Sequence, residues 1–129
     1  MGNFDIHSDE CENDKAPTRR RIFIATGSGI APFCAAFDEG IRAGDLLLFG
    51  CATADEDLTR RLKTPIPSVI RCMTRESSDA AFKGRVTDYL RTTGIDQGAD
   101  YYVCGSPAMV ADVRRVIRSG GGRVYCESF

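Results

Sequence analysis

The residues of this chain best suited to chemistry form a glycine-rich turn directly after a short apolar run. Ile22–Ala25 favours a strand buried on both faces, and Thr26-Gly27-Ser28-Gly29 follows it at once. Glycines allow a sharp turn with bare backbone N–H groups, and Pro32 suits the first turn of a following helix. Because a helix N-terminus presents N–H donors and the positive end of its dipole, this turn could hold a pyrophosphate.

The turn has a second interpretation. Glycines between a strand and a helix also serve proteins that bind no nucleotide, so the pattern alone fits a plain connecting turn equally well. The spacing is not the G-x-G-x-x-G fingerprint of dinucleotide-binding folds, because Pro32 stands where the third glycine would be. The local sequence leaves both interpretations open.

Apolar runs and chain breakers predict the elements that position this turn. Strands are expected at 22–25, 46–51, 68–73, 100–104 and 124–129, and helices at 31–42, 53–62, 86–93 and 107–119. This alternation predicts an α/β fold with a five-stranded open parallel sheet in the order 3-2-1-4-5, Rossmann-like, with helices on both faces. Ligands of such sheets bind beyond the carboxyl ends of the strands. The glycine turn and a second turn, Gly105-Ser106-Pro107, both belong to that edge.

Composition indicates one globular domain. The chain has 129 residues, 43% of them hydrophobic, and its 17 basic and 18 acidic residues give a formal charge of -1. This balance argues against a nucleic-acid partner. No apolar run approaches the roughly 20 residues of a membrane span, and the first ten residues do not resemble a signal peptide, so we expect a soluble, cytoplasmic chain.

The cysteines predict neither a metal site nor a disulfide framework. They are widely spaced and contain no C-x-x-C pair, so reduced and mostly buried thiols are expected, at Cys11, Cys34, Cys51, Cys72, Cys104 and Cys126. The only histidine is His7, which lies in a polar lead-in, so histidine-based catalysis is not expected.

Five segments, taken in order over essentially the whole chain, resemble the pyridine-nucleotide domain of the ferredoxin–NADP reductase family. They are Ala25–Phe33, Leu48–Cys51, Thr74–Glu76 with Lys83–Val86, Val103–Val110, and Glu127–Phe129. Gly2-Asn3-Phe4 also resembles the segment with which the family's FAD-binding barrel closes. The resemblance implies that residues 1–20 are a polar lead-in left from that barrel and its linker, and that 21–129 form the NAD(P)-binding domain of a longer protein.

The resemblance also implies roles for particular residues. Thr74 and Arg75 match a pair that grips the adenosine 2′-phosphate, Cys104 matches a cysteine beside the nicotinamide C4, and Glu127 matches an acidic residue near the chain end. The implied cofactor-binding residues are Thr26, Gly27, Ser28, Gly29, Pro32, Thr74, Arg75, Arg85, Gly105, Ser106, Pro107, Met109 and Phe129. Phe129 would cover the flavin ring. Plainer interpretations stay open for three of these residues: Cys104 as a small core residue, Arg85 as a solvated side chain, and Phe129 as an exposed chain end.

The function implied by this resemblance is hydride transfer between NADPH and an FAD held by the missing barrel. Electrons would then pass to an iron–sulfur or flavin protein, with Ser28, Cys104 and Glu127 placing the nicotinamide against the flavin. NAD stays possible because Glu76 follows Arg75. The alternatives are a nucleotide-binding electron-transfer subunit of the dihydroorotate dehydrogenase type, suggested by Lys83–Asp88, and a non-catalytic nucleotide sensor. The isolated chain is expected to be inactive.

Overall fold

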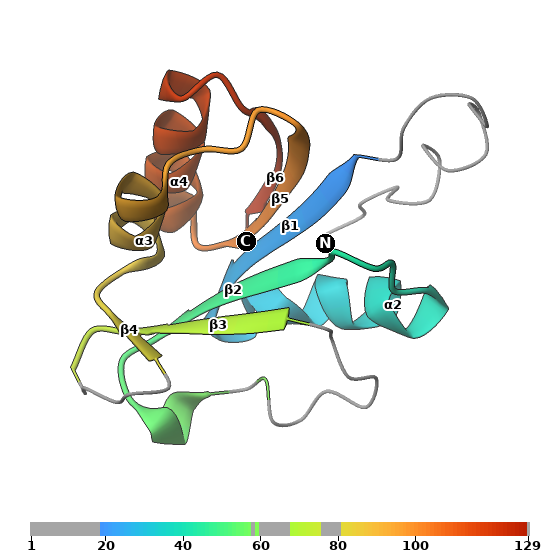
Figure 1. The fold of residues 1–129 in the computed structure, drawn as a ribbon. Helices are drawn as coiled ribbons and strands as arrows, with labels where there is room; N and C mark the ends of the chain where they lie inside the picture. The colour runs from blue at the N-terminus through green and yellow to red at the C-terminus, as the bar shows by residue number, and fades with distance from the viewer. Residues whose placement is uncertain (1–18, 58, 60–67, 76–80, 129) are drawn as a thin grey trace.

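The computed structural model describes residues 19–57, 59, 68–75 and 81–128, with Ala54, Glu127 and Ser128 described by their backbone alone. They form an α/β fold around one sheet of six parallel strands in the order β4-β3-β2-β1-β5-β6 (Figure 1). The predicted five-stranded sheet with the order 3-2-1-4-5 is therefore wrong. A sixth strand, β4 (Ala81–Lys83), extends the sheet beyond β3, in a stretch where no strand was expected.

The remaining strands lie where the apolar runs predict them. They are β1 (Arg20–Thr26), β2 (Leu46–Cys51), β3 (Ser68–Met73), β5 (Ala99–Gly105) and β6 (Arg123–Ser128). The central strands β1, β2 and β5 are buried almost throughout, as expected for parallel strands that are covered on both faces. β1 begins two residues before its apolar run, because its first arginines are held by neighbouring strands and loops.

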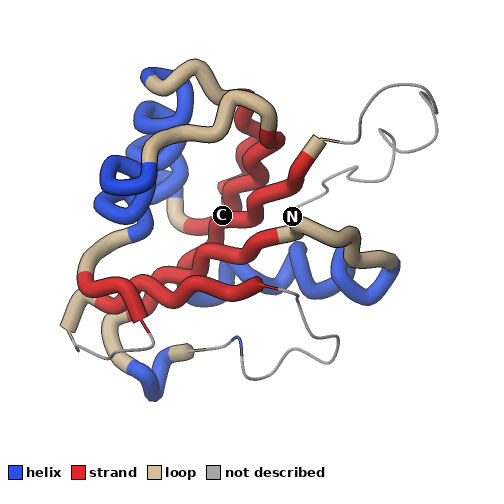
Figure 2. Tube along the Cα trace, in the orientation of Figure 1, coloured by secondary structure: helices blue, strands red, loops and turns tan. Residues whose placement is uncertain are grey.

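Helices cover both faces of the sheet (Figure 2). On one face α2 (Ala31–Glu39) places Phe33 and Phe37 edge-on against Phe23 of β1, with ring centroids 5.2 and 4.9 Å away. On the other face α3 (Val86–Thr93) and α4 (Pro107–Ser119) bury Leu90, Val113 and Ile117 in a second apolar cluster. The helices thus fix the sheet from two sides and leave the ends of the strands accessible.

Two predicted helices differ from the structure. α2 ends at Glu39 instead of Arg42, because the chain becomes extended at Gly40. Of the helix predicted at 53–62, the described residues contain a single 3-10 turn, η2 (Ala54–Glu56), and positions 58 and 60–62 lie outside the described residues. In the described part of the chain no helix is long and apolar enough to cross a membrane, and no group of His, Cys, Asp or Glu side chains could hold a metal ion.

Candidate functional site

The glycine turn joins β1 to α2 at the carboxyl end of the sheet. Thr26 ends the strand, a 3-10 turn, η1 (Gly27–Ile30), follows, and α2 then starts with proline in its first turn. Gly27 has a φ of 52°, a conformation that glycine adopts at little cost. The sequence predicted the glycine turn and the helix start, but not the 3-10 turn between them.

The two predicted glycine turns lie against each other. A Cβ at position 29 would come within 2.4 Å of the carbonyl oxygen of Cys104 and 2.9 Å of the Cα of Gly105. Both of these are backbone atoms of β5 and cannot move aside as a side chain could. Glycine at position 29 therefore lets the start of α2 pack directly on the end of β5, and the two helix N-termini, those of α2 and α4, flank the same strand ends.

Thr26 lies at the centre of this edge, between the ends of three strands. A Cβ at Gly50 would be 2.9 Å from its Cγ2, and a Cβ at Gly105 would be 3.0 Å from its Oγ1. The sequence placed Gly50 inside an expected strand and the segment Leu48–Cys51, but gave it no role of its own. A glycine inside a strand run is itself a signal of close approach by another group, so the sequence did contain a clue.

A cavity of about 300 Å³ opens beside Thr26. It is bounded by the ends of β1, β2 and β3 and by the first turns of α3 and α4. Four residues expected to bind a cofactor line it: Thr26, Thr74, Arg85 and Met109. Sequence reasoning did not assign a role to the other residues that line the cavity, among them Cys51, Cys72 and Asp112.

Thr74 and Arg75 follow β3 on the rim of this cavity. Their backbone N–H groups donate to the carbonyl oxygens of Cys51 and Ala52, at 3.2 and 2.9 Å, so the backbone of both residues is fixed. Both residues are exposed, and within the described residues the guanidinium of Arg75 has no hydrogen-bond or ion-pair partner. Lys83 adds a second cation, since its Nζ donates to the carbonyl oxygen of Thr74 at 3.1 Å. Sequence reasoning quoted Lys83 in a motif but did not name it as a site residue.

Both helices that border the cavity start with ordered caps. The Asp88 carboxylate accepts a hydrogen bond from the backbone N–H of Arg85 at 3.0 Å, which fixes the first turn of α3. Ser106 is the N-cap of α4, and its hydroxyl accepts from the N–H of Met109 at 3.3 Å. The structure therefore gives Ser106 a capping role and gives Pro107 the first helical position, where a proline is favoured.

The residues expected near the nicotinamide are not all at the surface of the site. Ser28 is exposed in η1, whereas the side chain of Cys104 is fully buried in the apolar cluster beneath α2. Glu127 is the backbone partner of Cys104 in the register of β5 and β6, which places it at the same edge. The side chain of Glu127 and the whole of Phe129 lie outside the described residues.

The chemistry of this edge is that of binding. Burial raises the pKa of the Cys72 thiol to about 12, with smaller contributions in the same direction from Cys51 and Asp88. A thiol with so high a pKa stays protonated and is a poor nucleophile at neutral pH. The edge instead combines backbone N–H groups at helix starts with cationic side chains, an arrangement suited to phosphate groups.

Comparisons with known proteins agree with this geometry. The sequence profile of a family described as an oxidoreductase NAD-binding domain matches residues 23–115. The toluate 1,2-dioxygenase electron transfer component of Pseudomonas putida is 32% identical over 126 residues, which cover 86% of this chain and 37% of the relative. The crystal structure of GcoB, an Amycolatopsis cytochrome P450 reductase, superposes with a TM-score of 0.67 at 22% identity, covering 90% of this chain and 39% of that one. The chain thus spans under two-fifths of the length of either protein.

Proposed function

This chain belongs to the oxidoreductase NAD-binding domain family, and we propose that it binds NADPH as the nucleotide-binding part of a flavin-dependent reductase. The observation that carries the proposal is the contact of the two glycine turns, in which Gly29 lies against the backbone of Cys104 and Gly105. This contact brings two helix N-termini to one place, beside a cavity. A pyrophosphate bound there would accept hydrogen bonds from backbone N–H groups of η1. The first two residues of α2 would not donate, because the N–H of Ala31 is bonded to the carbonyl oxygen of Ser28 and Pro32 has no N–H.

A preference for NADPH over NADH is supported by the cations around Thr74. A 2′-phosphate carries nearly two negative charges, and the planar guanidinium of Arg75 can donate two parallel hydrogen bonds to it. The hydroxyl of Thr74 can donate another hydrogen bond to the phosphate. The ammonium of Lys83 lies nearby, because it donates to the backbone carbonyl oxygen of Thr74. NADH lacks this phosphate and gains nothing from these charges.

Substitution of Arg75 tests this proposal. Charge-assisted hydrogen bonds contribute about 1.5–3 kcal/mol, so we expect Arg75→Ala to weaken NADPH binding at least tenfold and to leave NADH binding nearly unchanged. Dissociation constants for both coenzymes, measured by calorimetry, decide the matter. Arg114→Ala, which removes an exposed cation of α4, is the matched control and should change neither constant. Equal losses of both coenzymes in the Arg75 variant would mean that Arg75 does not read the phosphate.

The site within the chain can be tested by NMR. On titration with NADPH, the amide signals of Gly27–Ala31 should shift most, because these residues form the turn at the proposed pyrophosphate position. Shifts confined to other residues would contradict the proposal.

The proposed reaction needs parts beyond this chain. A nicotinamide supplies the hydride when bound, and a flavin held by another domain would accept it. Ser28, Cys104 and Glu127 would help to place the nicotinamide, because the backbone of all three lies at this edge of the sheet. That both similar proteins are named as an electron transfer component and a reductase supports onward transfer to an iron–sulfur or flavin protein. The chain alone should purify colourless and should not oxidise NADPH.

A further inference from the structure

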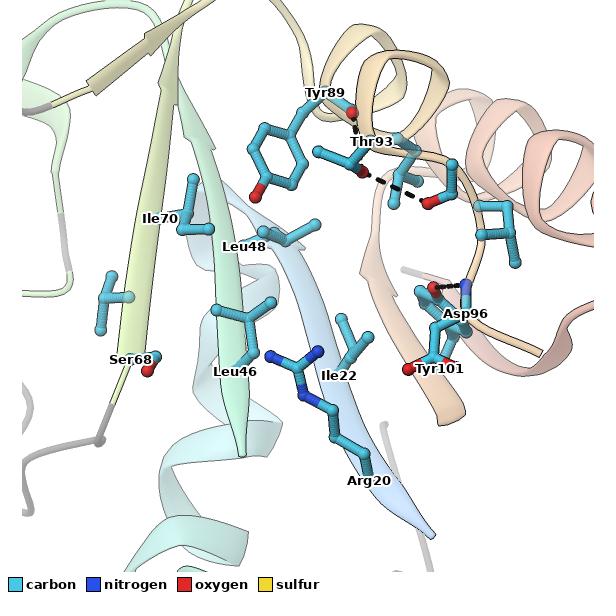
Figure 3. Close-up of a pocket in the computed structure, with 14 residues that line it drawn as sticks. Arg20, Ile22, Leu46, Leu48, Ser68, Ile70, Tyr89, Thr93, Asp96 and Tyr101 are labelled. Carbon is cyan, nitrogen blue, oxygen red and sulfur yellow. Dashed lines mark hydrogen bonds between the residues drawn. The ribbon is translucent and has the colours of Figure 1, made fainter. Parts of the chain in front are cut away.

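A second and larger cavity opens at the opposite, amino end of the same sheet (Figure 3). Its volume is about 680 Å³, within the range of sites that bind small organic molecules. The first halves of β1, β2 and β3 form its floor through Ile22, Leu46, Leu48 and Ile70. The last turn of α3 and the segment that leads to β5 form its wall. None of its lining residues belongs to the cavity beside Thr26.

One cation faces this apolar floor. Arg20 is held by a single hydrogen bond from its Nε to the carbonyl oxygen of Gly44, at 2.9 Å. Its two terminal amino groups have no hydrogen-bond or ion-pair partner among the described residues, and Figure 3 shows them directed toward Leu46 and Ile22. The adjacent arginines differ, because Arg19 and Arg21 each form an ion pair with an aspartate. Arg20 is thus an exposed guanidinium that is anchored through its Nε, and its two terminal amino groups point toward apolar side chains.

Hydroxyl groups complete the polar part of the cavity. Tyr89 extends from α3 with its phenol oxygen toward Leu48 and Ile70, and Ser68 lies at the rim where β3 begins. The only acidic residue among the lining residues is Asp96. One of its carboxylate oxygens accepts from the N–H of Gly98 at 2.8 Å, and its own N–H donates to the phenol oxygen of Tyr101 at 2.8 Å. Asp96 thus bonds to Gly98 and Tyr101, whereas the positive charge among the lining residues belongs to Arg20.

We propose that this cavity is a binding site for a small organic carboxylate with an apolar body. The apolar body would lie on Leu46, Leu48 and Ile70, and the carboxylate would pair with the terminal amino groups of Arg20. A single free guanidinium matches the single charge of a carboxylate, whereas a phosphate monoester would bring nearly two charges into a cavity that also holds Asp96. This site is independent of the proposed nucleotide function, because it lies at the other end of the strands.

A charged and a neutral probe with the same apolar body test the proposal. 4-Phenylbutyrate and the neutral 4-phenyl-1-butanol are titrated separately into the 129-residue chain, and binding is followed through the NMR signals of backbone amides and methyl groups. We expect both probes to shift the NMR signals of Leu48, Ile70 and Gly94. The acid should bind about fivefold more tightly than the alcohol. Saturating NADPH should not displace either probe.

Two variants separate the charged and apolar parts of the site. Arg20→Gln should weaken the acid about fivefold and leave the alcohol unchanged, whereas Arg91→Gln, which removes an exposed arginine outside the cavity, should change neither. Ser68→Trp places a large ring at an exposed position on the rim of the cavity and should abolish binding of both probes. The amide spectrum of this variant should remain that of a folded protein. Equal affinity of acid and alcohol for the unmodified chain, or shifts outside the cavity, would overturn the proposal.

Discussion

The two ends of the sheet are held together by different kinds of contact. At the carboxyl end, three glycines bring backbone and side-chain atoms of neighbouring strands together around Thr26. At the amino end, ion pairs link β1 to its neighbours. Arg19 donates to Asp100 at the start of β5, and Arg21 pairs with Asp45 just before β2. Arg123 of β6 adds a longer contact to Asp100, at 3.7 Å.

The two ends of the sheet are therefore expected to contribute differently: the carboxyl end to binding and the amino end to stability. The carboxyl end keeps its N–H groups and the cations near Thr74 available because glycines make the contacts there. Among the described residues of the amino end, Arg19, Arg21 and Arg123 pair with aspartates, whereas Arg20 bonds to a backbone carbonyl oxygen. A charge at the amino end is therefore expected to matter for stability, and a glycine at the carboxyl end for both stability and binding.

The largest effect is expected from Asp45→Ala. Arg21 and Asp45 are 2% and 1% exposed, and the two carboxylate oxygens accept from Nε and Nη2 of Arg21 at 2.9 and 2.5 Å. Removing the carboxylate leaves a buried, unpaired guanidinium, so the free energy of unfolding should fall by about 3–5 kcal/mol in urea denaturation. Arg115→Ala, which breaks a pair whose side chains are 73% and 51% exposed, should cost well under 1 kcal/mol.

A double variant sharpens this result. Arg21→Met together with Asp45→Leu replaces the pair by apolar side chains, which removes the unpaired charge and should recover much of the lost stability. If Asp45→Ala and Arg115→Ala prove equally mild, the ion pairs of the amino end do not hold it together.

An intermediate effect is expected from Gly29→Ala at the other end. The added methyl group would overlap backbone atoms of β5, so α2 or β5 must shift, at about 1–3 kcal/mol of stability. Because the two glycine turns would separate, NADPH binding should weaken at least tenfold. In Gly40→Ala the methyl group meets no atom within 4 Å and the backbone is extended, so stability and binding should stay near those of the parent chain. A Gly29→Ala variant with normal NADPH affinity would refute the proposed position of the pyrophosphate.

The smallest effect concerns the floor of the carboxyl-end cavity and depends on pH. Burial raises the pKa of Cys72 from its ordinary value of 9.0 to about 12, so above pH 9 the thiol ionises in the unfolded chain but not in the folded one. The stability that this thiol contributes is complete below pH 9 and is lost as the pH rises toward 12. Between pH 8 and pH 9.5 the loss should be about 0.8 kcal/mol.

Two variants isolate this contribution. Cys72→Ala should unfold with a correspondingly weaker pH dependence, measured by urea denaturation at both pH values. Val113→Ala, which shortens a side chain of the same cavity without a titrating group, should be less stable yet keep the original dependence. An unchanged dependence in Cys72→Ala would show that water reaches the thiol.

The sequence determined the parts of this protein that depend on neighbouring residues. Apolar runs predicted β1, β2 and β5, because a parallel strand covered on both faces is built mainly from apolar residues. Shorter apolar stretches predicted β3 and β6, which are less buried. Proline and serine fixed the start of α4, because their preferences act within one turn. The glycine turns were found for the same reason, and they placed the candidate site at the carboxyl edge. The family membership followed from the order of these segments.

Tertiary structure alone decided what depends on partners distant in the chain. β4 has only three residues, Ala81–Lys83, and forms by pairing with the edge of β3, so its own short sequence does not reveal it. The burial of Cys104 depends on α2, and the pairing of Arg21 with Asp45 depends on the register of β1 with β2. Local sequence predicted neither the contact of Gly50 with Thr26 nor the cavity at the amino end of the sheet. Each of these features depends on residues that are distant in the chain and close in space. How the sheet and helices pack decides which of them meet, and neighbouring residues in the sequence do not.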